Sequence, residues 1–150
     1  RIKQILKYEG AMDEAYAPQS ITLTIEDHLD ISRGDVLVKT GDAPVVAKAF
    51  DAMLCWLSEQ PLDLSRKYLI KQSTHVVKAL IGRIDYRVDI NTMDQESATT
   101  LTMNDIAHVG IKVQLPLVCD GYQRNRATGC FIIIDESSNN TVAAGMITVH

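Results

Sequence analysis

Apolar and polar residues alternate along several short segments of this chain. Residues 21–26 and 111–115 place an apolar side chain at every second position, and residues 84–90 place a charged one at every odd position. Successive side chains of a β-strand point to opposite faces, so each segment has one apolar and one polar face. The pattern predicts strands that are buried on one side only.

Two other segments are apolar without alternation. Residues 130–134 are continuously apolar, which is typical of a central strand, and residues 142–147 are its expected partner. Residues 135–140 between them are rich in turn-forming residues, so we expect a hairpin. The composition of residues 47–59 also fits a buried helix, but no capping signal precedes them, and we interpret them as a strand.

Turn signals recur along the chain with no amphipathic helix between them, a pattern typical of β-sandwiches and β-barrels. The stretch Thr-Gly-Asp-Ala-Pro at residues 40–44 is the best candidate for a domain boundary. Before it we expect about four strands, too few to close a barrel, and after it about six or more, enough for a small one. The sequence therefore predicts an all-β chain in which residues 1–41 end one barrel and residues 42–150 form a second, complete one.

The composition permits a packed core and restricts the partners. With 46% hydrophobic and 23% charged residues, a chain of this size can build a core without disulfide bonds. The net charge of −4 argues against nucleic-acid binding, which depends on neutralising phosphates. Apolar runs are far shorter than the roughly 20 residues of a membrane-spanning helix, so we expect no membrane partner.

Cysteine usage indicates a reducing compartment. An odd number of cysteines without a secretory signal is typical of reduced thiols in a cytoplasmic protein. Residues 1–5 lack an initiator Met and resemble the middle of a strand, which suggests a piece of a larger protein. The cysteines lie in apolar runs, so we expect all three side chains in the core: Cys55, Cys119 and Cys130.

The sequence contains none of the common motifs for catalysis, cofactors or metals. It has no Gly-rich loop ending in Lys-Ser or Lys-Thr, and no Cys-x-x-Cys. The histidines are far apart in sequence, and we expect His28 and His108 at turns. We therefore expect no catalytic site, cofactor or metal here, and a binding or structural role instead.

Residues 120–129 form the one polar constellation that we single out as a candidate interface. Arginine guanidiniums form bidentate contacts with carboxylates and phosphates, and Arg and Tyr are enriched at protein interfaces. The alternative is a solvated loop in which an arginine pairs with an aspartate of its own barrel. The candidate interface residues are Tyr122, Arg124, Asn125 and Arg126.

The same loop carries a family resemblance. Residues 120–135 read Asp-Gly-Tyr-Gln-Arg-Asn-Arg-Ala-Thr-Gly-Cys-Phe-Ile-Ile-Ile-Asp, and residues 140–147 read Asn-Thr-Val-Ala-Ala-Gly-Met-Ile. They resemble the end of the GTPase subunit of bacterial ATP sulfurylase, sulfate adenylyltransferase subunit 1. Residues 25–38 resemble the end of that family's second domain, and residues 89–93 and 101–109 are similar to parts of its third domain. The resemblance covers nearly the whole chain.

The resemblance implies an architecture like that of elongation factor Tu, with a GTP-binding domain followed by two β-barrels. Residues 1–41 would close the second domain, and residues 42–150 would be the third, a complete six-stranded antiparallel barrel. In the family, GTP hydrolysis drives a partner subunit that makes adenosine 5′-phosphosulfate from ATP and sulfate, and some relatives continue into an adenylylsulfate kinase domain. The implied partners are that catalytic subunit and the chain's own GTP-binding domain. GTP and Mg²⁺ would bind in that domain, which is absent here, so no catalytic or nucleotide-binding residue is carried over.

Two alternatives stay open. The first is a translation elongation factor whose third domain helps to hold aminoacyl-tRNA. Such factors typically read Gly-Arg-Phe-Ala-Val-Arg-Asp where this chain has Cys130 and Ile134 at the two arginine positions, which weakens that interpretation. The second is an unrelated carbohydrate- or ligand-binding β-domain. That function would need an aromatic cluster near one face, and the single tryptophan, Trp56, lies in an apolar run.

Overall fold

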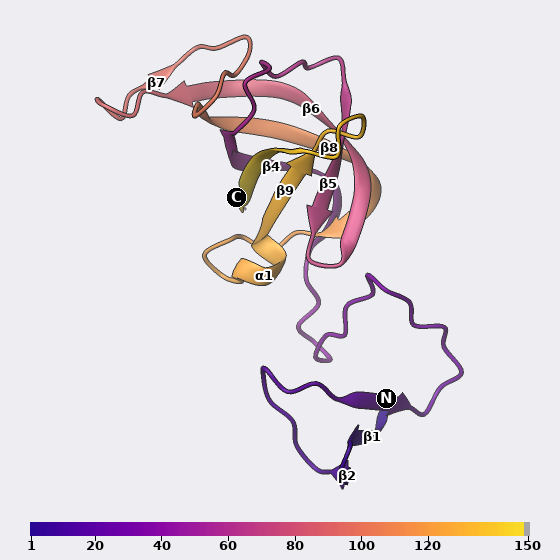
Figure 1. The fold of residues 1–150 in the computed structure, drawn as a ribbon. Coiled ribbons are helices and arrows are strands. Elements are labelled where there is room, and N and C mark those ends of the chain that lie inside the picture. The colour runs from indigo at the N-terminus through magenta and orange to yellow at the C-terminus, as the bar shows by residue number, and fades with distance from the viewer. Residues whose placement is uncertain (149–150) are drawn as a thin grey trace. The chain divides into compact units, whose positions relative to one another are not determined.

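Strands make up almost all of the regular structure in residues 1–148, the part of the chain that the computed structural model describes (Figure 1). The chain divides into two units, Arg1–Asp35 and Val36–His150. The division therefore falls a few residues before the 41/42 boundary that the turn signals suggest. Within residues 1–148 there is no helix with the length and hydrophobicity that crossing a membrane requires.

The first unit holds a three-stranded antiparallel sheet. Its strands are β1 (Ile2–Lys7), β2 (Gly10–Met12) and β3 (Thr22–Ile25), in the order β2-β1-β3. Residues 22–25 of the alternating segment at residues 21–26 form β3, as predicted. We expected about four strands before the boundary, and this unit has three among its described residues. Residues 29–38, although apolar at intervals, form no strand.

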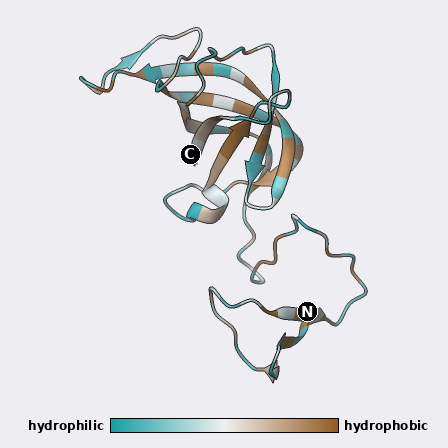
Figure 2. Cartoon of the chain, in the orientation of Figure 1, coloured by the Kyte–Doolittle hydropathy of each residue, from teal (hydrophilic) through white to brown (hydrophobic). Residues whose placement is uncertain are grey.

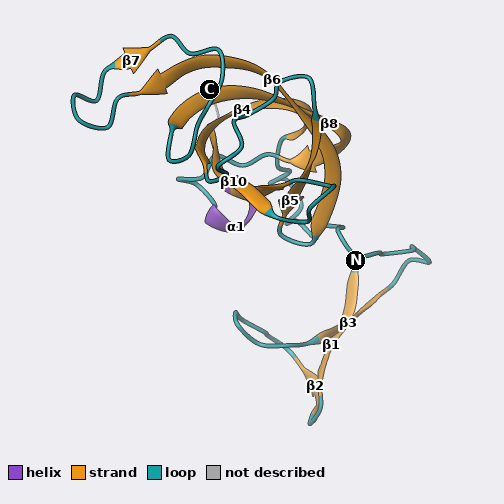
Figure 3. Cartoon of the chain, turned by 45° about the horizontal axis from the view of Figure 1, so that its top comes forward, coloured by secondary structure: helices purple, strands orange, loops and turns teal. Residues whose placement is uncertain are grey.

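The second unit is a closed antiparallel barrel. Six strands follow one another in the order β5-β9-β10-β4-β8-β6, and pairing between β5 and β6 closes the ring. In Figure 3 these strands curve around a common interior. A short β7 (Gln95–Glu96) pairs with the end of β6. The six barrel strands are β4 (Val46–Trp56), β5 (Lys67–Gln72), β6 (His75–Val88), β8 (Ile106–Val118), β9 (Cys130–Ile134) and β10 (Thr141–Thr148).

The strand predictions for this unit are confirmed. Residues 47–59 contain most of β4 and no helix, residues 84–88 of the segment 84–90 belong to β6, and residues 111–115 belong to β8. The predicted hairpin joins β9 to β10, with Ala144 opposite Ile132. β9 lies between β5 and β10, so it is an interior strand, and it is hydrophobic along its length in Figure 2.

The core of the barrel follows from the period of two along its strands. On β4, Ala52, Leu54 and Trp56 are almost completely buried, and the residues between them face outward. Each fully buried large apolar side chain contributes roughly 1.5–3 kcal/mol relative to exposure. Trp56 packs edge-on against Tyr68, with ring centroids 5.9 Å apart, and its indole N–H donates to the Gln60 carbonyl at 2.8 Å. Trp56 is therefore a core residue, with its polar atom satisfied inside the protein.

His108 corrects the sequence interpretation, because it lies within β8 and not at a turn. A register shift between Ile84 and Tyr86 places Asp85 beside it, although the two residues are far apart in sequence. The Nδ1 atom of His108 is 2.8 Å from the Asp85 carboxylate, and the imidazole stacks on Tyr86 with ring centroids 5.3 Å apart. A bulge of this kind cannot be read from hydrophobic spacing.

The cysteines also differ from expectation. Cys119 is buried, and burial raises the pKa of its thiol. Cys55 is half-buried and Cys130 is exposed, so two of the three do not belong to the core. The reason is strand phase: Leu54 and Trp56 point inward on β4, and Phe131 and Ile133 do so on β9. The intervening positions must then face outward.

Candidate interaction surface

The loop at residues 120–129 joins β8 to β9 and is internally ordered. It ends in α1 (Arg126–Gly129), a single helical turn that the sequence did not predict. The Asn125 side chain caps this turn by accepting a hydrogen bond from the Ala127 amide at 3.1 Å. The amides of Arg124 and Asn125 both donate to the Gly121 carbonyl, at 2.9 and 3.0 Å. Asn125 therefore serves the loop's own fold.

The base of the loop is fixed to the barrel. The Thr128 hydroxyl donates to the Asp120 carboxylate at 2.6 Å, which holds the two ends of the loop together. The buried side-chain amide of Gln72, on β5, donates to the Val118 carbonyl at 2.7 Å and also to that of Thr128. The nitrogen of this buried amide donates to both carbonyls and would be costly to leave unpaired, so these contacts give the loop a defined shape.

The other three candidate residues lie on the solvent side of this loop. Tyr122 is half-buried, and its amide donates to the Ile147 carbonyl at 3.1 Å. The guanidinium of Arg126 lies over the Tyr122 ring, 5.7 Å from its centroid. Arg124 forms an ion pair with Asp42 at 3.1 Å, which is the internal pairing that the alternative interpretation required.

The ion pair between Arg124 and Asp42 contributes little to the stability of the barrel. The side chains of Arg124 and Asp42 are 69% and 65% exposed. Pairs this exposed contribute between zero and about 1 kcal/mol, because water screens them and two long side chains must be ordered. Among residues 1–148, no carboxylate lies within ion-pair distance of Arg126. Both guanidiniums are therefore available to a partner at low cost.

An apolar area next to the loop was not predicted from the sequence. Outward-facing side chains of β4, β10 and β9 form two rows across the strands, one of Cys55, Ala144 and Ile132 and one of Met53, Met146 and Cys130. They line a groove of about 550 Å³. The outer face of a solvated antiparallel barrel is normally polar. We call these six residues, with Tyr122, Arg124 and Arg126, the contact face.

The loop and the two rows form one continuous surface. Tyr122 lines the apolar groove together with Met53 and Met146, and the same three residues line a second hollow of about 490 Å³ that Arg124 also borders. Half-buried or exposed apolar side chains thus lie beside two exposed guanidiniums. An apolar centre with aromatic and arginine side chains beside it is typical of protein–protein interfaces.

One signal in the sequence could have revealed this face. Residues 130–134 are apolar at every position, so the outer face of that strand is apolar as well as the inner one. A strand that is solvated on one side alternates, whereas one covered on both sides reads as continuously apolar.

Among the described residues, no group of three His, Cys, Asp or Glu side chains is arranged to hold a metal ion.

Residues 49–148 match the family described as GTP-eEF1A C-terminal domain-like. The chain belongs to this family. The matched range runs from the fourth residue of β4 to the end of β10, and it includes every residue of the contact face.

Relatives of this GTP-eEF1A C-terminal domain-like chain include two named sulfate adenylyltransferase subunit 1. The one from Alteromonas mediterranea is 44% identical over 98% of this chain, and the one from Bacteroides fragilis is 44% identical over 97%. A bifunctional enzyme CysN/CysC from Rhodopirellula baltica is 42% identical over 98%. The chain spans 31% of the length of the first two relatives and 23% of the third. The resemblance to sulfate adenylyltransferase subunit 1 is therefore confirmed.

A solved structure shares the fold of this GTP-eEF1A C-terminal domain-like chain. The crystal structure of sup35 complexed with GDP matches with a TM-score of 0.85 over 99% of this chain and 37% of that one, at 16% identity. Likeness at so low an identity is evidence for fold alone. It agrees with the predicted fold class, an all-β chain with a six-stranded antiparallel barrel of the translation-factor type.

Proposed function

We propose that this chain is the non-catalytic β-barrel region of a cytoplasmic sulfate adenylyltransferase GTPase subunit. Residues 1–41 would end its second domain and residues 42–150 would form its third. In this role the region links a GTP-binding domain to the catalytic subunit, so that GTP hydrolysis is coupled to formation of adenosine 5′-phosphosulfate from ATP and sulfate. The identity of 44% to subunits of that name supports the assignment.

The contact face is the observation that carries this proposal. Met146 is 42% exposed and Cys130 is also exposed, so apolar surface remains in water when the chain is alone. Contiguous apolar surface on a barrel marks a place where another protein binds. A non-catalytic barrel affects a reaction by binding and positioning other proteins or domains. The contact face provides the surface for that binding.

The loop gives the contact its specificity. Arg126 over Tyr122 is a preorganised pair at the edge of the apolar groove, and Arg124 can exchange Asp42 for a carboxylate of the partner at little cost. GTP and Mg²⁺ are proposed to bind in the GTP-binding domain of the full-length subunit, which lies outside this chain. This chain has no Gly-rich loop ending in Lys-Ser or Lys-Thr that could hold the phosphates.

The experiment is Met146→Glu in the full-length subunit, co-expressed with the catalytic subunit. The carboxylate would lie in the middle of the apolar groove, so we expect assembly and GTP-stimulated adenosine 5′-phosphosulfate synthesis to fall by about tenfold or more, with melting of the barrel little changed. The matched control is Leu115→Glu, since Leu115 is also an exposed apolar residue (56%) but lies on β8 outside the contact face. Full assembly and synthesis in both variants would refute the proposal.

A further inference from the structure

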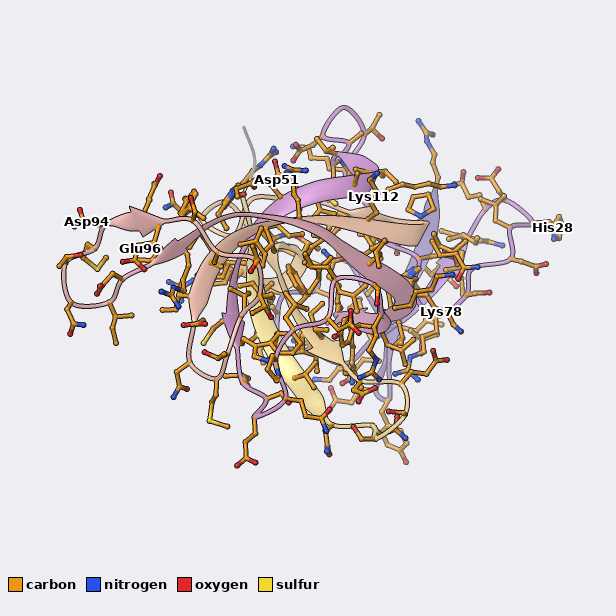
Figure 4. All side chains as sticks on the ribbon, turned by 90° about the horizontal axis from the view of Figure 1, so that it is seen from above. His28, Asp51, Lys78, Asp94, Glu96 and Lys112 are labelled. Atoms are coloured by element: carbon orange, nitrogen blue, oxygen red, sulfur yellow. The ribbon has the colours of Figure 1, made fainter. Side chains whose placement is uncertain are left out.

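A second groove lies on the outer side of three other barrel strands. It has a volume of about 490 Å³ and is lined by Lys67 of β5, Lys78 of β6 and Lys112 of β8. Lys67 is opposite Leu80 of β6, and Leu80 is opposite Lys112, so the two lysines flank the leucine in one row across the sheet. Figure 4 labels Lys78 and Lys112 on their adjoining strands.

The positive charge of this groove is largely unneutralised. Lys78 pairs with Glu136 at 3.1 Å, but both side chains are about half exposed, so the pair is weak. Among residues 1–148, Lys67 and Lys112 have no carboxylate within ion-pair distance. Three cations thus surround Leu80 on a chain whose net charge is −4.

Protection of a sheet edge does not explain all of these lysines. Exposed lysines on strands commonly protect a sheet edge from pairing with another chain. At Leu80 and Lys112, β6 and β8 pair with a strand on both sides, so there is no sheet edge there, whereas the pairing of β5 with β9 begins at Leu69, two residues after Lys67. Lys67 and Lys112 are two strand spacings apart, roughly 10 Å, and like charges at that distance repel weakly. Lys112 therefore lies where no sheet edge needs protection, and its repulsion with Lys67 is a small unfavourable contribution to stability.

We propose that this groove binds an acidic segment of another polypeptide. Two carboxylates of the segment would contact Lys67 and Lys112, and an apolar side chain between them would cover Leu80. In an extended segment of the type Glu-x-Leu-x-Glu, the three recognised side chains share one face and match the order Lys, Leu, Lys across the strands.

The lining of the groove favours an acidic polypeptide over a nucleic acid. Its other residues are Ala79, Val113 and Gln114, with no arginine to read base edges and no aromatic side chain on which a base could stack. The acidic chain also repels a long polyanion as it approaches. The groove uses none of the contact-face residues, so this inference can fail without affecting the proposed function, and the reverse is also true.

The test is a titration of the isotope-labelled chain with a synthetic peptide that repeats Glu-Ser-Leu-Ser-Glu, followed by backbone amide chemical shifts at low ionic strength. We expect the largest shifts around Lys67, Leu80 and Lys112. We also expect the double variant Lys67→Gln/Lys112→Gln to weaken binding by about tenfold, since two exposed ion pairs are lost. The matched control is Lys3→Gln/Lys7→Gln, which removes the same charge from exposed positions in the first unit.

Three results would overturn the proposal. The first is an absence of shifts at the groove, and the second is equal weakening in both double variants, which would indicate only long-range attraction. The third is tighter binding of a single-stranded oligonucleotide of equal charge, lost in Lys67→Gln/Lys112→Gln, which would assign the groove to nucleic acid. A peptide with Gln in place of Glu should not bind.

Discussion

Gly129 lies directly against the backbone of Tyr122: a Cβ atom on residue 129 would be 2.5 Å from the Tyr122 Cα and 2.7 Å from its amide nitrogen. Real Cβ atoms do not approach backbone so closely, and backbone atoms cannot move aside as a side-chain end can. The two ends of the loop at residues 120–129 therefore meet only because residue 129 has no side chain. The position of Tyr122 on the contact face depends on this contact.

Gly129→Ala should therefore displace Tyr122 and destabilise the barrel by about 1–3 kcal/mol, as overpacking commonly does. Thermal unfolding would measure the loss, and amide shifts of residues 120–129 would show the displacement. Gly82→Ala is the control, because a Cβ there meets only the Gly110 carbonyl at an ordinary 3.9 Å. Equal unfolding temperatures for wild type and Gly129→Ala would contradict the geometry.

The three cysteines should differ in reactivity in the order of their exposure. Under native conditions an alkylating reagent should modify Cys130 fastest, Cys55 more slowly and Cys119 slowest, because burial both shields the Cys119 thiol and raises its pKa. Mass spectrometry of timed samples gives the three rates. In the assembled full-length protein, covering of the contact face should slow Cys130 and Cys55 specifically. Unchanged rates there would count against that covering.

Asp135 should make the barrel less stable in acid. The pKa of its carboxyl is lowered, first by the Ser137 backbone amide, then by the Ser137 hydroxyl and by the nearby charge of Arg66. A group whose folded pKa lies below its unfolded value, about 4, stabilises the fold above that pH. This stability is lost as the pH falls through the folded pKa.

The corresponding variant is Asp135→Asn, measured by melting temperature against pH. We expect a lower melting temperature than wild type at neutral pH and a shallower fall below about pH 4. Glu59→Gln, which neutralises an exposed carboxylate of the same unit, serves as control and should follow wild type. Parallel curves for wild type and Asp135→Asn would show that the Ser137 and Arg66 contacts do not stabilise the carboxylate.

Arg124→Ala and Arg126→Ala test the loop as an anchor. In the full-length subunit we expect stability to change by no more than about 0.5 kcal/mol, because the Asp42 pair is exposed. Affinity for the partner should fall by about 2 kcal/mol or more if these side chains are hot spots. Lys39→Ala is the control, an exposed cation on the same unit. A large drop in melting temperature would assign the arginines to the barrel, and no change in either quantity would leave the loop as solvated surface.

The fold was largely predictable because period-two patterns and turn residues are local signals. β4 was correctly distinguished from a helix, and the hairpin between β9 and β10 was located from its turn. The phase of a continuously apolar strand is not predictable from its sequence, so the expectation that Cys130 lies in the core is wrong, and Cys130 faces outward. His108 and Asp85 were missed as neighbours because a bulge in β6, not sequence spacing, brings them together. The contact face was missed because its rows combine three strands whose register the sequence does not state.

The two apolar rows combine strands from opposite ends of the second unit: β4 is its first strand, and β9 and β10 are its last two. During synthesis β4 leaves the ribosome long before β10, so Met53 and Cys55 have no row to join until the final strand is made. Ala144 and Met146 of β10 occupy the middle of the two rows, and a nascent or truncated chain that ends before β10 has no such surface. The docking proposed for this face is therefore open only to a finished barrel, and incomplete chains would be excluded from assembly.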